Sequence, residues 1–222
     1  MDNILSWIIW IPIIGMVAIA FIPRDKKDLI KQIAAVTTGI QLLLAIMLWS
    51  VFDATSGSFQ FMERAEWIPS LGISYILGID GLSLPMVALN ALIAFLGVFV
   101  SWNIDRAVKG YFALFLLLDT GVMGVFLSLD FFLFYVFWEV MLLPMYFLIG
   151  MWGGPQREYA AIKFFLYTLF GSVLMLIALL ALYFACGQTF DMILMMERAP
   201  FALDGVVSVS YTHLTLPTTP YV

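Results

Sequence analysis

The stretch Phe131-Phe-Leu-Phe-Tyr-Val-Phe-Trp-Glu-Val-Met-Leu-Leu-Pro144 places one acidic side chain, Glu139, inside an otherwise aromatic and aliphatic run. The apolar run continues to about Met151, so it has the roughly 20 residues that a helix needs to cross a bilayer. It does not alternate with period two, as a membrane β-strand would. Because backbone polar groups in lipid must be paired internally, the stretch predicts a transmembrane helix.

Five further apolar stretches of similar length predict an all-α, polytopic transmembrane helix bundle over residues 1–204. The six predicted spans cover approximately residues 4–22, 30–52, 82–102, 111–129, 131–151 and 162–186. Composition agrees, since 64% of the 222 residues are hydrophobic and 11% are charged, against about 45–50% and about 25% in soluble domains. A soluble core cannot bury this excess, so lipid is the expected solvent.

The distribution of basic residues predicts the orientation of the spans. The first span lacks the basic leader and cleavage site of a signal peptide, so we expect it to be retained. The loops that follow the odd-numbered spans contain most of the basic residues, namely Arg24, Lys26, Lys27, Lys31, Arg106, Lys109, Arg157 and Lys163; Arg64 and Arg198 lie on the opposite side. Since basic loops face the cytoplasm, the N-terminus is predicted outside, in a bacterial inner (plasma) membrane.

Two of the segments outside the predicted spans have interpretations of their own. The loop from Asp53 to Ile79 is expected to form an outer surface or a lid, and Asp80 is expected to cap the helix that follows it. The tail 205–222 is rich in Thr, Ser and Pro and is interpreted as a frame or adapter artefact. It contains His213, the only histidine, which is not expected to bind a ligand because it lacks partners.

The sequence also excludes several classes of function. A single cysteine, Cys186, cannot build a disulfide framework, a zinc site or an iron–sulfur site. Glycine-rich phosphate-binding motifs are missing as well, so we expect no cofactors in this chain and no direct NADH binding. The net charge of −5 gives no hint of the basic patch that nucleic-acid binding requires.

Glu139 is the main candidate for function. It lies about 12 Å along its predicted helix, near the middle of a hydrocarbon core about 30 Å thick. A charge there costs on the order of 2.5–3.5 kcal/mol on insertion scales. Structural contacts between membrane helices commonly use uncharged polar side chains, so Glu139 is interpreted as a proton carrier, with a structural contact as the alternative. Pro144 removes a hydrogen bond to the Val140 carbonyl, which either kinks the helix or only adjusts its packing.

Two further ionisable residues have open interpretations. Asp119 lies eight residues into the fourth span and is expected either to relay protons to or from Glu139 or to form an interhelical hydrogen bond. Lys163 opens the sixth span. Its stem either extends to the headgroups, or its charge lowers the cost of ionising Glu139 as a charge partner.

The stretch from Gly124 to Gly150 closely resembles membrane subunit M of the proton-translocating NADH:quinone oxidoreductases (respiratory complex I), an antiporter-like chain equivalent to mitochondrial subunit 4. The segments Met151-Trp-Gly-Gly154, Lys163-Phe-Phe-Leu-Tyr-Thr168 and Gly78-Ile-Asp-Gly-Leu-Ser-Leu84 resemble it too. The likeness extends from about residue 1 to residue 200, and Trp-Glu-Val-Met-Leu-Leu-Pro-Met-Tyr is its most specific part.

This resemblance implies the N-terminal part of a fourteen-helix antiporter-like fold with inverted repeats. In that family the acid matching Glu139 pairs with a lysine and takes part in proton translocation coupled to quinone reduction. The implied partners are the other membrane-arm subunits and the lipid bilayer. The chain would be a non-redox subunit of the enzyme and not catalytic in isolation. The alternatives are a subunit of a multi-subunit cation/proton antiporter and an assembly scaffold without an ion pathway.

Overall fold

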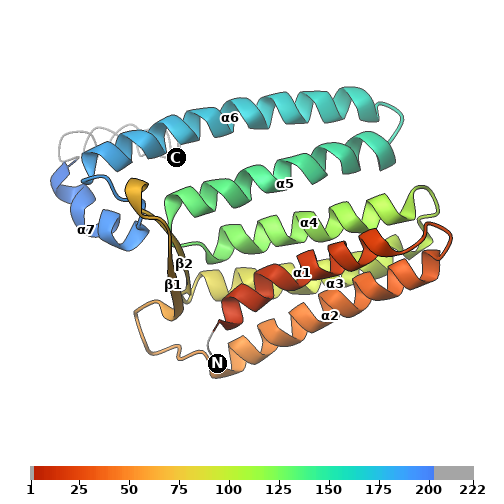
Figure 1. The fold of residues 1–222 in the computed structure, drawn as a ribbon, viewed down its shortest axis with the longest axis horizontal. Coiled ribbons are helices and arrows are strands. Elements are labelled where there is room, and N and C mark those ends of the chain that lie inside the picture. The colour runs from red at the N-terminus through yellow and green to blue at the C-terminus, as the bar shows by residue number, and fades with distance from the viewer. Residues whose placement is uncertain (1–2, 203–222) are drawn as a thin grey trace, which may run out of the picture.

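The computed structural model describes residues 3–202 and is predominantly helical (Figure 1). Six of its helices are long and apolar enough to cross a membrane: α1 (Ile4–Phe21), α2 (Lys27–Val51), α3 (Ser83–Val100), α4 (Val108–Leu127), α5 (Phe131–Trp152) and α6 (Arg157–Ala185). They coincide with the six predicted spans, so the predicted polytopic helix bundle is confirmed. The largest shift is at α6, which begins at residue 157 instead of 162 because helical hydrogen bonding continues into the charged residues before the apolar stretch.

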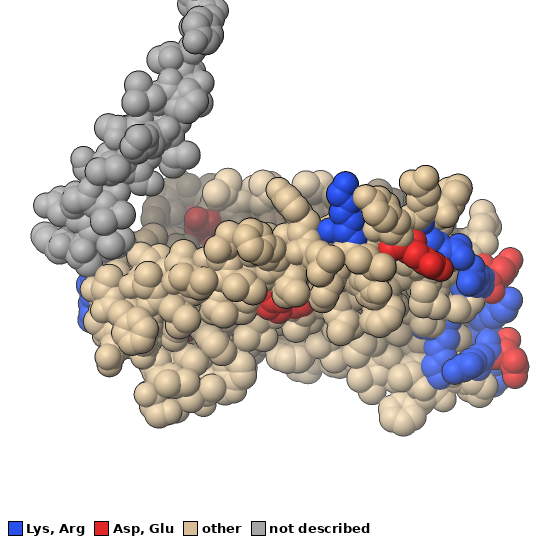
Figure 2. All heavy atoms as spheres, turned by 90° about the horizontal axis from the view of Figure 1, so that it is seen from above, with Lys and Arg blue, Asp and Glu red and all other residues tan. Residues whose placement is uncertain are grey.

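The helices pack in an order that differs from their order in the chain. α5 lies between α4 and α6, α4 packs against α1, and α2 packs against both α1 and α3 (Figure 1). The connections α1–α2, α3–α4 and α5–α6 lie at one end of the bundle. Figure 2 shows lysine and arginine side chains gathered at one end of the molecule, with few charged residues along its tan middle. This is the charge distribution of a membrane-spanning bundle.

The predicted loop between residues 53 and 79 is folded as a β-hairpin. Strands β1 (Gln60–Ile68) and β2 (Ile73–Ile79) pair antiparallel, and a short 3₁₀ turn, η1 (Pro69–Leu71), joins them. Gly72 follows the turn with a φ of 65°, a left-handed conformation that glycine adopts without steric cost. The hairpin lies across the end of the bundle opposite the three helical connections (Figure 1).

The hairpin is anchored to the helices through backbone hydrogen bonds. Leu129, between α4 and α5, donates its N–H to the Ile76 carbonyl at 2.8 Å, and Leu77 forms a β-bridge with Ser128. The last four residues of β2, from Ile76 to Ile79, are all buried. This burial does not alternate, so the strand lacks the period-two signal by which strands are recognised.

A seventh helix, α7 (Met192–Ala202), was not predicted from the sequence. It begins after Asp191, whose carboxylate accepts hydrogen bonds from the N–H groups of Ile193 at 2.9 Å and Leu194 at 3.3 Å. Such N-capping satisfies backbone donors that have no partner within the helix. The tail 205–222 and His213 lie outside the described residues.

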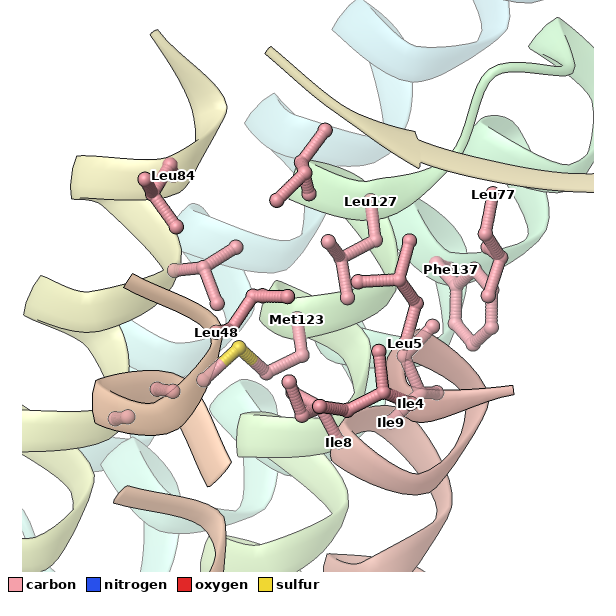
Figure 3. Packing of buried hydrophobic residues seen from close by; sticks show 14 of the residues in the cluster. Ile4, Leu5, Ile8, Ile9, Leu48, Leu77, Leu84, Met123, Leu127 and Phe137 are labelled. Carbon is pink, nitrogen blue, oxygen red and sulfur yellow. The ribbon is translucent and has the colours of Figure 1, made fainter. Parts of the chain in front are cut away.

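Two apolar clusters fill the bundle formed by α1–α4, one towards each end. The cluster near the hairpin draws on several helices, with Ile8 and Ile9 from α1, Leu48 from α2 and Met123 from α4 (Figure 3). The other cluster is centred on Phe112, which is fully buried. Between the two clusters lie the buried polar side chains Thr37, Thr38, Gln41, Asp119 and Thr120.

α4 and α5 approach closely because glycine replaces larger side chains at their contact. A Cβ atom on Gly121 would lie 2.9 Å from the Cβ of Met141, and one on Gly124 would overlap the ring of Phe137. Small residues allow such close packing of membrane helices, where dispersion contacts supply much of the association energy. The contact fixes the position of the Glu139 helix relative to the rest of the bundle.

The predicted cap of α3 is confirmed. Asp80 accepts hydrogen bonds from the N–H groups of Leu82 at 3.1 Å and Ser83 at 2.7 Å, and the Ser83 hydroxyl accepts from the Asp80 N–H at 2.9 Å. Partial burial acts to raise the pKa of Asp80, but the hydrogen bonds from Ser83 and Leu82 outweigh it and the pKa is lowered.

Candidate functional site

Glu139 is the ninth of the 22 residues of α5, so it lies well inside the span. Its Oε1 atom is buried and accepts no hydrogen bond within the described part of the chain. Tyr135 lies one turn earlier, and its side chain interacts both with Glu139 and with Ser172 of α6. Buried carboxylate oxygens without a partner are uncommon in folded proteins.

Pro144 is buried within α5, and the helix continues past it to Trp152. Because proline has no N–H, the carbonyl of Val140 has no partner in the usual i+4 position. This carbonyl is next to Glu139, so a backbone acceptor and a titratable side chain lie side by side in the same turn. The helix is continuous through Pro144, and the choice between a kink and an adjustment of packing stays a prediction.

Lys163 lies apart from Glu139. Its side chain is exposed, and its Nζ is 5.7 Å from the ring centroid of Tyr159, one turn earlier on α6. Ser172, the α6 residue near Tyr135, is nine residues further along α6, which corresponds to about 13 Å at 1.5 Å per residue. No ion pair joins Lys163 to Glu139 among residues 3–202. The role of Lys163 as charge partner stays a prediction.

Asp119 is also separate from Glu139. Its side chain is 4% exposed, and its Oδ1 accepts a hydrogen bond from Asn90 Nδ2 of α3 at 2.8 Å. Asp119 points towards α2 and α3, whereas Gly121, two residues later, faces α5. Two residues correspond to about 200° around a helix. Asp119 therefore points away from the face of α4 that contacts α5, the helix of Glu139. The structure thus shows the predicted interhelical hydrogen bond, and the relay stays a prediction.

A group of acidic residues at the hairpin end was not identified from the sequence. Asp130 is fully buried and caps α5, because its carboxylate accepts from the N–H groups of Phe132 and Leu133 at 2.9 and 3.1 Å. It also accepts from the Ser74 N–H of β2 at 3.1 Å. Burial raises the pKa of Asp130, and these hydrogen bonds only partly oppose the effect.

Asp191 lies beside Asp130, since the two residues form a β-bridge, and its negative charge adds to the rise in the pKa of Asp130. Asp191 also forms an ion pair with Arg64 of β1. The Leu-Asp-Phe-Phe sequence at 129–132 contained a usable signal, an acid directly before an apolar helix. The pairing with Arg64 could not be found in the same way because the two residues are 127 positions apart.

Groups of three or more His, Cys, Asp or Glu side chains that could hold a metal ion are not found in the described part of the chain. Cys186 is buried and free. The candidate groups lie at three separate places: Glu139 on α5, Asp119 where it contacts Asn90 of α3, and Asp130 with Asp191 at the hairpin end.

Comparison with known proteins shows which proteins this chain resembles. A model of the NADH:quinone oxidoreductase/Mrp antiporter transmembrane family matches residues 128–215. The chain is 39% identical over 206 residues to NADH-quinone oxidoreductase subunit M of Rhodobacter capsulatus, covering 91% of the chain and 40% of the relative. It is 41% identical over 187 residues to NADH-ubiquinone oxidoreductase chain 4 of Arabidopsis thaliana, covering 83% and 38%. The predicted resemblance to subunit M is confirmed.

Solved structures agree with this result. A chain of respiratory complex I from Thermus thermophilus, solved with bound NADH, superposes with a TM-score of 0.75 at 26% identity, covering 87% of this chain and 39% of that one. A chain of the Mrp complex from Dietzia sp. superposes with a TM-score of 0.65 at 22% identity over 84% of this chain and 20% of its own length, which supports the fold alone. Both neighbours are subunits of multi-subunit membrane complexes.

The chain spans about two-fifths of the length of the subunit M relatives that it matches. Its six apolar helices and this likeness establish it as an integral membrane protein with an antiporter-like fold. Within the matched family region lie Asp130, Glu139, Pro144 and Lys163, whereas Asp119 precedes it.

Proposed function

We propose that the chain is part of a membrane-arm subunit of an NADH:quinone oxidoreductase and that Glu139 carries protons that are translocated in step with quinone reduction. The observation that carries this proposal is the buried, unpaired Oε1 of Glu139 within an apolar span. The similarity to subunit M supports the identity of the complex. The subunit itself is proposed to hold no redox cofactor and to require the other membrane-arm subunits for activity.

The proposed chemistry is a reversible protonation controlled by a nearby positive charge. A carboxylate at this depth is disfavoured by loss of hydration and binds a proton unless a cation or hydrogen-bond donors compensate. The Tyr135 hydroxyl is the nearby donor that would stabilise the ionised form. When a cation moves away, the carboxylate takes up a proton; when the cation returns, the carboxyl group releases it.

Lys163 is the described residue that we propose as a long-range partner. Lys163 is displaced by about 13 Å along α6 from Ser172, the residue of that helix near Tyr135. Two unit charges that far apart or farther, at an effective dielectric constant of about 20, interact by roughly 1 kcal/mol or less. That energy changes the protonation equilibrium by less than about tenfold. Lys163 therefore modulates Glu139 in this arrangement, and a cation that controls its protonation must approach more closely.

The test is substitution of Glu139 in the full-length protein within its complex, reconstituted into proteoliposomes. Glu139→Gln keeps the shape but cannot release a proton, so we expect proton pumping per quinone reduced to fall strongly. Glu139→Asp retains a carboxyl group and should retain more pumping. Glu66→Gln, on the exposed side of β1, is the matched control and should pump normally. Normal pumping by Glu139→Gln in an assembled complex would refute the proposal.

The second candidate is a subunit of a multi-subunit cation/proton antiporter, because the matching family includes Mrp antiporters and the fold resembles a chain of the Mrp complex. Co-purification from native membranes separates the two candidates. Recovery with NADH-oxidising, iron–sulfur-containing subunits supports the first, and recovery with other antiporter-like chains alone supports the second.

Orientation is a separate part of the proposal. We place the N-terminus outside and the basic connections in the cytoplasm, in a bacterial inner membrane. Lys26 and Lys27 lie at the basic end and Glu66 at the hairpin end. A cysteine introduced at position 26 should be labelled by a membrane-impermeant reagent only after the cytoplasmic side is opened, and a cysteine at position 66 should be labelled from outside. The reverse pattern would contradict this orientation.

A further inference from the structure

A hollow of about 600 Å³ lies between the last turn of α1 and the first turns of α4, at the basic end of the bundle. Small residues form part of its wall, namely Ala20 of α1 and Gly110 and Ala113 of α4. A Cβ atom on Gly110 would approach another helix no closer than 3.8 Å, at the ring of Trp152. The packing of α1 against α4 therefore leaves space that the described side chains do not fill.

The hollow is lined by three basic side chains, Arg24, Lys27 and Lys109, and by one acidic side chain, Asp105, which leaves two excess positive charges. Arg24 forms no ion pair within residues 3–202. Lys27 lies 3.8 Å from Asp105 Oδ1, but the two side chains are 48% and 79% exposed, and such an exposed pair is weak. The charges of Arg24 and Lys27 are thus available to an anion.

Lys109 is held in place at the hollow. Its Nζ donates to the carbonyls of Ala20 and Ile22 at 2.8 Å, at the C-terminal end of α1, where a cation is favoured. These carbonyls have no net charge, so the ammonium group keeps its own. Because an ammonium group has three donors, one more remains for a ligand. A cation that is already positioned loses less conformational entropy when it binds an anion.

The polar part of the hollow lies at the rim of the bundle and the apolar part lies within the spans. Arg24 follows the end of α1 by three residues, and Lys27 is the first residue of α2, so both belong at the level of the lipid headgroups. Ala20 and Ala113 lie inside α1 and α4. Val17, one turn before Ala20, is 44% exposed and extends the apolar surface along the same face of α1. A soluble anion would leave this apolar part empty, whereas a phospholipid has groups for both parts.

We propose that this hollow binds an anionic phospholipid, with the headgroup phosphate between Arg24, Lys27 and Lys109 and an acyl chain along Ala20 and Ala113. Basic pockets between membrane helices are a type of site that anionic headgroups occupy. A zwitterionic headgroup has no net charge to match the two excess positive charges, so a lipid with a net negative headgroup is bound in preference. The proposal does not depend on the role of Glu139.

Photocrosslinking in the full-length protein within its complex tests the proposal. The complex is reconstituted into phosphatidylcholine vesicles that contain a small amount of a probe lipid, either phosphatidylglycerol or phosphatidylcholine, with a diazirine group in one acyl chain. We expect the phosphatidylglycerol probe to label the peptides that contain Ala20 and Ala113 about fivefold more strongly, or more. Equal labelling by the two probes would overturn the proposal, because the headgroup charge would not select the lipid. Absence of labelling would also overturn it, because another protein segment would then cover the hollow.

Two substitutions in the same loop separate a defined site from general attraction to the basic end. Arg24→Gln removes a charge that lines the hollow, and we expect labelling by the phosphatidylglycerol probe to fall about fivefold. Lys26→Gln removes the same charge two residues later, from an exposed side chain that does not line the hollow, and should change labelling little. Equal losses in the two variants would overturn the proposal.

The apolar part of the site has its own test. Ala113→Leu adds volume to the hollow without changing its charge and should reduce labelling, with the melting temperature of the variant as the check on folding. If this variant does not assemble, Arg24→Gln still decides, since Arg24 loses no ion pair. Undiminished labelling of a folded Ala113→Leu would overturn the placement of the acyl chain.

A competitor distinguishes a lipid from a soluble anion. Glycerol 3-phosphate carries a phosphate group on glycerol but has no acyl chains, so at millimolar concentration it should leave labelling by the phosphatidylglycerol probe unchanged. Displacement of the probe by this competitor would show a site for free phosphate compounds and would overturn the assignment to a lipid.

Discussion

The Arg64 guanidinium of β1 forms an ion pair with the carboxylate of Asp191, 127 residues later, where α7 begins. The Arg64 side chain is 58% exposed, whereas that of Asp191 is 7% exposed. The pair therefore extends from solvent into the end of the bundle. It joins the hairpin to the segment that follows α6, two parts of the chain that local sequence does not connect.

Replacing the two members of this pair should have unequal effects. Arg64→Met removes a cation that is more than half exposed and leaves the Asp191 carboxylate in place as the cap of α7, and an ion pair that is partly open to solvent contributes less than a buried one. Asp191→Ala removes the ion pair and also the cap of α7, and loss of a cap costs about 0.5–2 kcal/mol. We expect Asp191→Ala to be the more destabilising by about this amount, measured as reversible unfolding in detergent micelles. Equal destabilisation would show that the cap does not contribute.

Asp130 should make stability depend on pH in a defined direction. Its pKa is raised in the folded state, mainly by burial, so the folded protein retains this proton over a range in which the unfolded chain has lost it. Stability from this group is therefore greatest below the ordinary aspartate pKa of about 4 and decreases as pH rises through the raised value. Asn is an equally good cap, so Asp130→Asn should remove this dependence.

The measurement is the difference in unfolding free energy between the unmodified protein and Asp130→Asn across that pH range. Because Asp53 and Asp80 have lowered pKa values, they act in the opposite direction, and taking the difference cancels their contribution. A difference that stays constant with pH would contradict the raised pKa of Asp130.

Glu63 should stabilise α1 from outside the helix. Its carboxylate accepts hydrogen bonds from the N–H of Leu5 at 2.7 Å and of Ser6 at 3.1 Å, and from the Ser6 hydroxyl. Asn3, before the helix, makes no side-chain cap. A negative charge at a helix N-terminus contributes about 0.3–1 kcal/mol, and more when partly buried. We therefore expect Glu63→Ala to destabilise by about 1–2 kcal/mol, and the neighbouring exposed Glu66→Ala to have little effect. Similar losses from both would exclude a capping role.

The closeness of α4 and α5 can be tested with a pair of glycine substitutions. A methyl group on Gly124 would overlap the Phe137 ring, whereas one on Gly171 of α6 meets nothing within 4 Å. We expect Gly124→Ala to cost about 1–3 kcal/mol through overpacking and Gly171→Ala to be neutral or slightly stabilising, because alanine favours the helix. The comparison requires unfolding curves for both variants in one detergent. A neutral Gly124→Ala would mean that the two helices separate readily.

The sequence was sufficient to predict the spans because hydrocarbon leaves the backbone few alternatives to a helix. The hairpin was missed because β2 is buried on both sides beneath helix ends and shows no alternation. Asp119 and Glu139 were recognised as acids within apolar runs, since that feature is local. The residues that contact Asp119 could not be recognised in the same way. Gln41 and Asn90 come from two other helices and are brought together only by packing.

The same reasoning explains why Asp130 and Asp191 were missed. An acid at a helix start resembles an ordinary cap in sequence, and only the fold shows that both lie together under Arg64. Predictions of helical spans thus succeed where lipid constrains the backbone. Predictions about pairs require knowledge of which helices are neighbours.

The hairpin joins α1, α5 and α7 at one rim of the bundle through Glu63, Ser74 and Arg64. At the opposite rim, α1 and α4 are connected through the Lys109 side chain, which donates to the carbonyls of Ala20 and Ile22 at 2.8 Å. A bundle that is held by the hairpin at one end and by a flexible lysine side chain at the other should pivot about the hairpin end. The helices should therefore move apart most at the end with the Lys109 contacts, and water should enter from that side.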